Sequence, residues 1–276
     1  MTATVTRLEL VDIGVNLTHR SFSSDRDAVL SRAHAAGVRR LVVTGTSLAH
    51  SREAQALCRR HLGVLYSTAG VHPHDASHYD DATRAGLLQL LAHDEVVAVG
   101  ECGLDFNRNY SPRPVQEKVF AAQLELAITV KKPLFLHERD AHPTLIAILD
   151  RFADGSGRLP VPAVVHCYTG GARALDDYLS RGFYIGITGW ICDERRGREL
   201  QELVKRIPLE RLMLETDAPF LMPRDLKPKP DPSRNEPATL SHIAKTVARC
   251  MDVELPRLAA ATTENACRFF RLPPTA

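Results

Sequence analysis

The order of structural elements in this chain is clearest in EVVAVGE (95–101), VQEKVFAAQLELAITVKK (115–132) and PLFLH (133–137). The outer two runs are short, apolar and rich in β-branched residues, which is typical of buried strands. The middle segment follows two prolines and repeats its apolar residues at helical spacing. A strand, a helix and a second strand in this order pair in parallel through a right-handed crossover. These residues therefore predict one β-α-β unit.

The same alternation extends over the whole chain. Eight apolar runs are predicted as strands: LELVDIGV (8–15), RLVVTG (40–45), VLYSTAGV (64–71), EVVAVGE (95–101), PLFLH (133–137), VPAVVH (161–166), FYIGI (183–187) and RLMLET (211–216). Amphipathic helices are predicted between most of them, for example over 25–37, where Gly37 is the expected stop signal. Strands that recur about every 25–35 residues are typical of an α/β fold of the (β/α)₈ TIM-barrel type. The alternative is a doubly wound sheet, but DIGVNLTH lacks the GxGxxG turn that normally accompanies it.

Length and composition favour one folded unit. The 276 residues are 44% apolar and 25% charged, as in a soluble globular protein. Barrels of about 250 residues form one domain. With no linker visible, we expect residues 1–276 to form a single barrel domain of the metal-dependent hydrolase type. The proline-rich segment 222–237 is interpreted as a long functional loop.

The cysteines and the N-terminus favour a reducing compartment. Six cysteines are scattered along the chain without CxxC spacing, which argues against a disulfide framework or a structural zinc site. The first residues, MTATVTRLELVD, lack the pattern of a signal peptide, and no apolar run reaches the length of a membrane span. We therefore expect a cytoplasmic protein with no membrane contact and no stable protein partner, and take a monomer as the default.

Side chains that can bind a metal recur where the predicted strands end. Glu101 ends the fourth strand, His137 the fifth and His166 the sixth, and Asp217 follows the eighth. The C-terminal ends of barrel strands meet at one face, so these residues are expected in one pocket as ligands of a divalent ion. A lone histidine after a strand is more often a capping or surface residue, but four such residues at one end favour a metal site. On the same rim lie Asp12, His72 and His74.

Basic and aromatic residues follow the strands as well. The basic residues of these loops are Arg108, Arg139, Arg195, Arg196, Arg224, Lys227, Lys229 and Arg234, and the aromatic ones are Phe106, Tyr168, Trp190 and Phe220. Together they have the composition of a surface that binds single-stranded nucleic acid. The alternative is that the loop arginines are only solvated and the aromatic rings only cap the core. As contacts to the substrate we select Arg108, Arg139, Tyr168, Trp190 and Arg224.

Long sequence blocks resemble a known family. DIGVNL, TAGVHPHD, VGECGLDFNRNYS, HERDAH, HCYTG, GFYIGITGWICDERRG and LETDAPFLMPRDLKPKP are similar, in this order, to blocks of the TatD family of metal-dependent deoxyribonucleases. The ITGWICDERRG and PRDLKPKP blocks resemble the bacterial branch after which the family is named. The resemblance spans nearly the whole chain. It implies a 3′-5′ exonuclease that acts on single-stranded DNA, with RNA as a second substrate, and a role in DNA repair or DNA degradation.

The resemblance also implies roles for individual residues. Glu101, His137, His166 and Asp217 match the metal ligands, and His72 matches a catalytic or phosphate-contacting group. The implied ion is Mg²⁺, with Mn²⁺ or Zn²⁺ as alternatives for a mixed imidazole and carboxylate site. We expect the ion to activate a water molecule while Asp217 orients or deprotonates it. Glu101, Asp217 and His72 are therefore the predicted catalytic residues.

One motif departs from the family pattern. Many relatives begin with DxHxH, whose two histidines bind a first metal ion, whereas this chain has Gly14 and Asn16 at those positions. A permanently occupied two-metal site is therefore not expected. Two other functions remain open at this point. One is a barrel amidohydrolase acting on a small-molecule amide or lactone, and the other is a nucleic-acid-binding barrel without catalysis.

Overall fold

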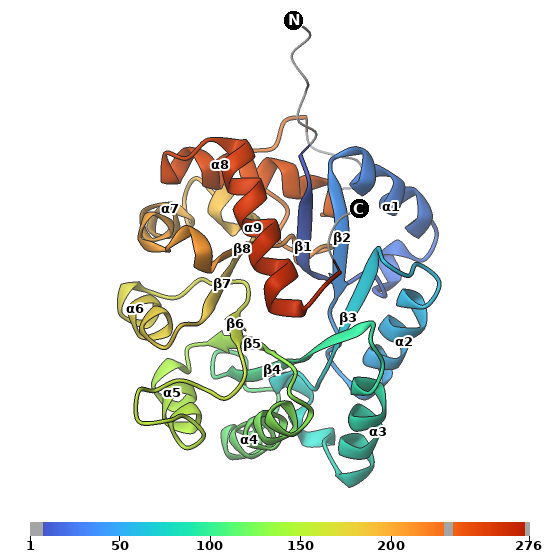
Figure 1. Ribbon diagram of the computed structural model, residues 1–276, viewed down its shortest axis with the longest axis vertical. Helices are drawn as coiled ribbons and strands as arrows, with labels where there is room; N and C mark the ends of the chain where they lie inside the picture. The colour runs from blue at the N-terminus through green and yellow to red at the C-terminus, as the bar shows by residue number, and fades with distance from the viewer. Residues whose placement is uncertain (1–7, 229–233, 274–276) are drawn as a thin grey trace, which may run out of the picture.

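The structure is a computed structural model that describes residues 8–228 and 234–273. Its eight strands are parallel and follow one another around the sheet in chain order (Figure 1). They are β1 (Leu10–Val15), β2 (Val38–Val43), β3 (Leu65–Ala69), β4 (Val96–Asp105), β5 (Leu134–Arg139), β6 (Ala163–Val165), β7 (Tyr184–Ile187) and β8 (Leu212–Leu214). Each overlaps a run predicted as a strand, and β2, β4 and β5 extend beyond theirs.

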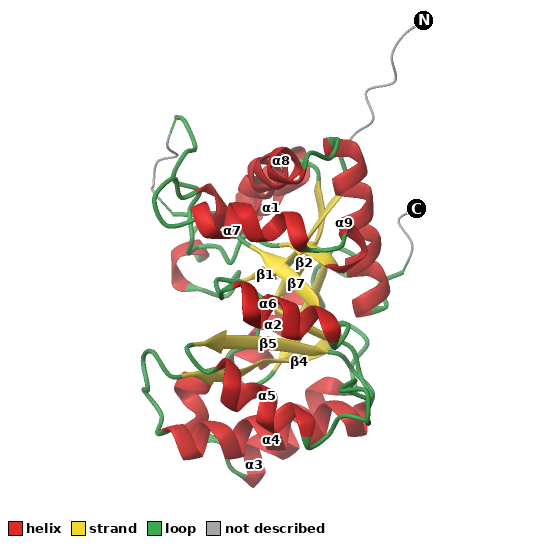
Figure 2. Cartoon of the chain, turned by 90° about the vertical axis from the view of Figure 1, so that its left-hand side faces the viewer, coloured by secondary structure: helices red, strands yellow, loops and turns green. Residues whose placement is uncertain are grey.

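Helices connect the strands and surround them (Figure 2). They are α1 (Arg26–Ala35), α2 (Leu48–Cys58), α3 (Asp81–Leu91), α4 (Arg113–Val130), α5 (His142–Asp150), α6 (Ala172–Ser180), α7 (Arg198–Leu203), α8 (Leu240–Met251) and α9 (Leu255–Phe270). Short 3₁₀ turns supplement them: η1 (Arg20–Phe22), η2 (Pro73–His78), η3 (Gly189–Cys192), η4 (Val204–Arg206), η5 (Leu209–Arg211) and η6 (Pro237–Thr239). No helix in residues 8–228 or 234–273 combines the length and apolar character needed to cross a membrane.

The last strand lies beside the first. Just beyond the end of β8, the backbone N–H of Asp217 donates to the carbonyl of Gly14 at 2.8 Å. The backbone N–H of Asn16 donates to the carbonyl of Ala218 at 2.7 Å. These bonds join the two edges that an open sheet would leave apart. The prediction of a (β/α)₈ barrel is confirmed, and the doubly wound sheet is excluded.

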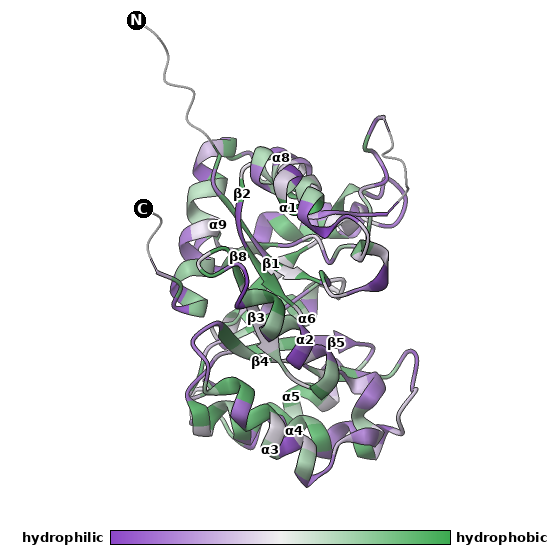
Figure 3. Ribbon diagram, turned by 90° about the vertical axis from the view of Figure 1, so that its right-hand side faces the viewer, coloured by the Kyte–Doolittle hydropathy of each residue, from purple (hydrophilic) through white to green (hydrophobic). Residues whose placement is uncertain are grey.

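Two apolar cores hold the barrel together. The larger core lies between the strands and the outer helices, which carry hydrophobic and hydrophilic residues along the same helix, as α4 and α8 show in Figure 3. The second fills the barrel interior with side chains such as Ile13 and Phe135. Phe269 and Phe270, at the end of α9, pack into this second core, and Phe269 contacts Tyr184 at the start of β7 with 5.2 Å between ring centroids. Apolar packing therefore closes the N-terminal end of the barrel, and polar chemistry is confined to the other end.

Candidate metal centre

Glu101 lies in a bulge of β4. In the pairing with β5, Gly100 faces Phe135 and Cys102 faces Leu136, so Glu101 is the extra residue between them. A bulge redirects a side chain out of the regular alternation of a strand. The prediction that Glu101 and His137 end their strands is wrong in detail, because β4 continues to Asp105 and β5 to Arg139. His166 and Asp217 do follow the ends of β6 and β8, as predicted.

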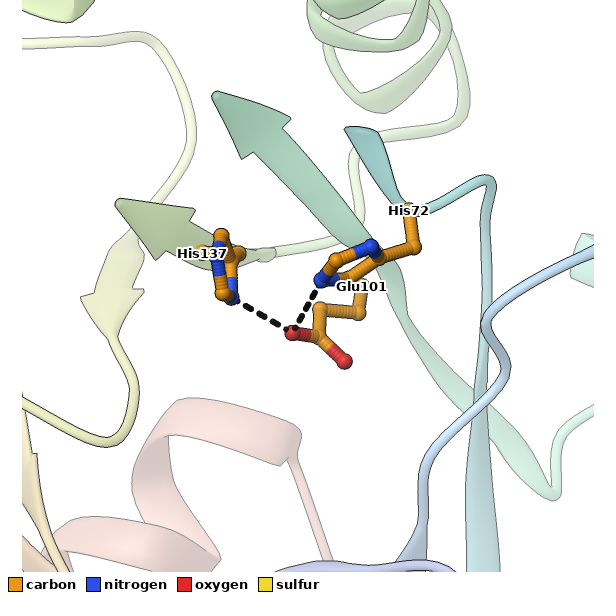
Figure 4. A group of neighbouring side chains, drawn as sticks. All are labelled: His72, Glu101 and His137. Atoms are coloured by element: carbon orange, nitrogen blue, oxygen red, sulfur yellow. Dashed lines mark hydrogen bonds and ion pairs between the residues drawn. The ribbon is translucent and has the colours of Figure 1, made fainter. Parts of the chain in front are cut away.

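Three imidazole rings converge on one oxygen of Glu101. Its Oε1 lies 2.8 Å from Nε2 of His166, 3.0 Å from Nδ1 of His137 and 3.3 Å from Nε2 of His72. Figure 4 shows His137, in β5, and His72, in the loop after β3, turned toward this oxygen. Glu101 itself is buried. The sequence therefore places one carboxylate and three imidazoles around a single point.

The hydrogen bonds of the rings distinguish His166 from His72. Nδ1 of His166 lies 3.3 Å from Oε2 of Glu215 and its Nε2 lies 2.8 Å from Oε1 of Glu101, so both ring nitrogens face carboxylate acceptors and can donate to them. Nδ1 of His72 instead accepts from the backbone N–H of His74 at 3.1 Å, so its proton is on Nε2. A cation bound at Nε2 of His166 would replace the proton there while Nδ1 still donates to Glu215, whereas His72 presents an N–H donor. His72 lies close enough to Glu101 and His137 for the three to hold an ion, but its tautomer argues for a donor role.

The electrostatics of the cluster suit a cation. Burial lowers the pKa of His166, but Glu101 and Glu215 outweigh burial, and the pKa is well above its usual value. Burial likewise raises the pKa of Glu101, but His166 and His72 outweigh it, and the pKa is well below its usual value. Nε2 of His137 is buried without a hydrogen bond and lies 3.4 Å from Oδ2 of Asp105. Buried polar atoms are normally satisfied, so this nitrogen fits a metal ligand.

Asp217 lines the same pocket on the side of β8. Its Oδ1 accepts from Nδ2 of Asn16 at 2.9 Å. Burial raises the pKa of Asp217 to about 7, and Glu101 and Glu215 add to that effect. Asp12 was expected on the rim, but it is fully buried, and both of its oxygens accept hydrogen bonds from Thr216. Asp12 therefore joins β1 to the end of β8 and does not face the pocket.

The cluster opens into a pocket of about 480 Å³. It is lined by Asn16, Thr46, His72, His74, Asp75, Glu101, Asp105, Arg108, His137, Arg139, His166, Cys167, Asp217, Phe220 and Leu221. A larger pocket of about 590 Å³ lies at the other end of the barrel, beside Phe270, but no histidine or cysteine lines it. The chemistry therefore belongs to the smaller pocket.

Two carboxylates of this site were missed in the sequence. Asp105, at the end of β4, accepts a hydrogen bond from Nε2 of His74 at 2.8 Å, and the nearby histidines hold its pKa well below its usual value although burial raises it. Glu215 is fully buried and accepts from the backbone N–H of Cys167 as well as from His166. Each directly follows a leucine near the end of a predicted strand, Asp105 in LDF and Glu215 in LET. This position was the signal that could have identified them.

The predicted substrate contacts divide into three groups. Arg108 and Arg139 line the metal pocket, together with the half-exposed ring of Phe220. Trp190 and Arg224 line an adjoining pocket. The prediction that Tyr168 stacks on bases is wrong: its side chain is only 2% exposed, and its hydroxyl donates to the carbonyl of Gly171 at 2.6 Å.

One further basic residue, Arg234, lies away from the site. Arg234 donates to Asp25 and to the carbonyl of Ser21, and its guanidinium lies 4.7 Å from the ring centroid of Phe22. It therefore fastens the loop that precedes α8 to the start of α1. Lys229 lies outside the described residues.

Comparison with known families identifies one model, described as TatD related DNase, which matches residues 11–271. Curated proteins similar to this chain carry the name 3′-5′ ssDNA/RNA exonuclease TatD. The protein from Escherichia coli strain K12 is 49% identical over 261 residues, covering 95% of this chain and 98% of its own. The protein from Cronobacter turicensis is 52% identical, covering 95% and 97%.

Solved structures agree with this similarity. The TatD homolog YjjV from Escherichia coli K12 superposes with a TM-score of 0.85 at 28% identity, covering 96% of this chain and 98% of that one. A TatD family hydrolase from Entamoeba histolytica gives a TM-score of 0.85 at 26% identity, covering 95% and 98%. Both comparisons extend over the whole barrel and include every strand that carries a residue of the metal centre.

Proposed function

The chain belongs to the family of TatD-related DNases, and we propose that it is a metal-dependent nuclease that removes nucleotides from the 3′ end of single-stranded DNA. We propose RNA as a second substrate, Mg²⁺ as the working ion, and a monomer acting in the cytoplasm. The observation that carries the proposal is the convergence of three imidazole nitrogens on Oε1 of Glu101 within a pocket lined by Arg108 and Arg139.

Glu101, His137, His166 and Asp217 are the proposed ligands of the ion. Two observations support this assignment: Nδ1 of His166 is held by Glu215, so that its Nε2 can exchange a proton for an ion, and Nε2 of His137 is buried without a hydrogen bond. A divalent ion held by such residues supplies Lewis-acid polarisation of a phosphoryl oxygen and lowers the pKa of water. Mixed imidazole and carboxylate ligands also accept Mn²⁺ and Zn²⁺, so all three ions belong in the assay.

The remaining groups hold the substrate and move protons. Water attacks phosphorus and gives a proton to Asp217, while the bond to the leaving oxygen breaks and that oxygen takes a proton from solvent. A carboxylate with a pKa of about 7 is well matched to that role. His72 stays neutral because burial lowers its pKa, and its Nε2–H stabilises the charge that develops on the phosphate. Arg108 and Arg139 bind phosphate oxygens from the rim.

The test is cleavage of a 5′-labelled single-stranded oligonucleotide with Mg²⁺, Mn²⁺, Zn²⁺ or chelator. We expect a ladder that shortens from the 3′ end, requires metal, and is lost in Glu101→Ala. His78→Ala is the matched control, because this histidine lies at the end of η2 with its side chain almost fully exposed. Cleavage by Glu101→Ala at the natural rate would overturn the ligand assignment. Cleavage at internal positions of the strand would overturn the assignment as an exonuclease.

The barrel alone does not separate a nuclease from an amidohydrolase. A barrel described as amidohydrolase 2, from Bifidobacterium longum subsp. infantis, shares the fold at 10% identity with a TM-score of 0.56. Similarity at that level concerns architecture, and function depends on the site. The family match and the arginines at the rim therefore carry the assignment. The oligonucleotide assay should be accompanied by simple amide and lactone substrates, which we expect to remain intact.

A further inference from the structure

A second pocket adjoins the metal centre. It has a volume of about 480 Å³, and its wall consists of residues from segments 189–196 and 221–224. Leu221 lines both this pocket and the metal pocket. The two segments pack closely because Gly189 has no side chain: a Cβ there would lie 2.3 Å from the carbonyl oxygen of Leu221. The second pocket is therefore a fixed extension of the first.

Two arginines of this pocket are held by one carboxylate. Nε of Arg196 donates to Oδ2 of Asp193 at 3.1 Å, and Nε of Arg224 lies 3.2 Å from the same oxygen. Asp193 is buried, and its other oxygen accepts the backbone N–H groups of Arg195 and Arg196 at 3.0 and 3.1 Å. The carboxylate is thus fixed by the backbone, and it fixes both guanidinium groups in turn.

The outer edges of both guanidinium groups remain available. Their contacts to Asp193 use Nε, and the Nη groups make no hydrogen bond with any residue in 8–228 or 234–273. The two side chains are 54% and 51% exposed. Arg196 also stacks on Trp190, with its Cζ 4.5 Å from the ring centroid. Two oriented guanidinium forks next to an indole match a phosphate followed by a base.

Charge separates this pocket from its neighbour. A third pocket, which meets the metal pocket at Arg139 and the second pocket at Trp190, is lined by Glu138 and Asp140 in addition to that single arginine. The second pocket has two arginines and one carboxylate. The second pocket therefore attracts a polyanion more strongly than the third pocket does. The strand therefore has one favoured way out of the metal centre.

We propose that the pocket at Trp190, Arg196 and Arg224 binds a phosphodiester of the substrate strand on the 5′ side of the bond that is cleaved. The inference rests on the proposed function, in which the 3′-terminal nucleotide occupies the metal pocket and the rest of the strand extends in the 5′ direction. A dinucleotide fills the metal pocket alone, whereas a longer strand reaches both pockets. The second pocket consequently gives long strands their affinity.

The kinetic test compares a thymidylate dinucleotide with a thymidylate dodecamer. In the natural chain we expect KM for the dodecamer to be at least tenfold lower. The double substitution Arg196→Gln and Arg224→Gln should remove this preference and leave the KM of the dinucleotide unchanged. The slope of log KM against log salt concentration should fall by about 0.7 for each arginine removed, as for other single-strand contacts. Arg198→Gln is the control, because this exposed residue follows in the same segment and lines neither pocket.

The fluorescence test uses Trp190, the single tryptophan of the chain. With chelator present to prevent turnover, we expect the dodecamer to change the emission of Trp190 and the dinucleotide to leave it unchanged. The inference would be overturned if the double variant kept the tenfold lower KM for the dodecamer and the salt dependence of the natural chain. That result would direct the strand to the pocket at Arg139. A protein that cleaves nothing would refute the proposed function, and the fluorescence titration would still decide whether this pocket binds the strand.

Discussion

The mouth of the barrel has two unlike halves. In one, the histidine half (His72, Glu101, His137, His166), nitrogen atoms converge on a carboxylate that faces an open pocket. In the other, the acid half (Asp12, Asn16, Glu215, Asp217), the side chains already bind one another or nearby donors. The side chains of the first half converge on one point, and those of the second are held by neighbouring donors. The histidine half thus supplies three of the four proposed ligands, and the acid half supplies Asp217 together with groups that position the ligands.

Gly14 explains why the acid half has no imidazole. A Cβ at this position would lie 2.3 Å from Oε2 of Glu215 and 3.2 Å from the ring of Phe135. Any side chain there would displace the carboxylate that binds His166. The histidine that many relatives carry at this position is incompatible with this placement of Glu215. We therefore propose one tightly bound ion per chain, held by Glu101, His137 and His166 of the histidine half together with Asp217.

The largest effect is expected from His166→Ala. Loss of a ligand that supplies several kcal/mol of transition-state stabilisation should lower kcat about 1,000-fold. The natural chain should gain about 2.7 kcal/mol from metal at one hundred times its dissociation constant, a rise in Tm of about 5–10 °C, and the variant should lose most of it. Oligonucleotide cleavage and thermal unfolding with and without Mn²⁺ measure both. A variant that is stabilised by metal as strongly as the natural chain would place the ion outside the histidine half.

A smaller effect is expected from Glu215→Gln in the acid half. An amide has the same shape, but with its oxygen on the backbone N–H of Cys167 its NH₂ group faces Nδ1 of His166, so the ring loses the carboxylate that orients it as a ligand. Loss of such a supporting partner typically costs about 10–100-fold in metal affinity. The half-saturating Mn²⁺ concentration for cleavage should rise by that factor, while kcat at saturating metal changes less.

The control for that experiment is Asp12→Asn, an equally conservative change at a buried carboxylate of the same half. Asp12 contacts Thr216 and the backbone of Gly14 and does not contact a ligand. Its substitution should lower stability and leave the half-saturating metal concentration unchanged. Equal shifts in both variants would mean that the acid half acts only through general destabilisation.

The fold follows from the sequence because the alternation of apolar runs and amphipathic helices is directly visible. The ends of β4 and β5 were less visible. The predicted runs end at Glu101 and His137, yet the backbones continue to pair as far as Asp105 and Arg139. Apolar periodicity indicates which way a side chain faces, and backbone pairing does not depend on it. Asp105 and Arg139, which line the metal pocket, occupy this unpredicted extension.

The site was predictable where position alone was sufficient. His137 and His166 were found because barrel strands end at one face. Glu215 was missed because its role depends on its hydrogen bond to His166 across the barrel, and no spacing in the sequence records that contact. Tyr168 was assigned wrongly because an aromatic residue after a strand can cap the core or face the solvent, and the two have the same local sequence.

The smallest effect is expected from Asn16→Ala, where the acid half meets the proposed general base. The amide of Asn16 donates to Oδ1 of Asp217 at 2.9 Å, and its loss removes one hydrogen bond to this carboxylate. A single hydrogen bond of this kind is worth about 1 kcal/mol, so kcat should fall about fivefold. Because Asp217 is also a proposed ligand, the half-saturating metal concentration should rise by at most about the same factor. Asn107→Ala is the matched control, since this amide donates to Asp140 outside the metal pocket. If Asn16→Ala instead lowers kcat as far as His166→Ala does, Asn16 holds the ion directly, and the acid half supplies a second ligand beside Asp217.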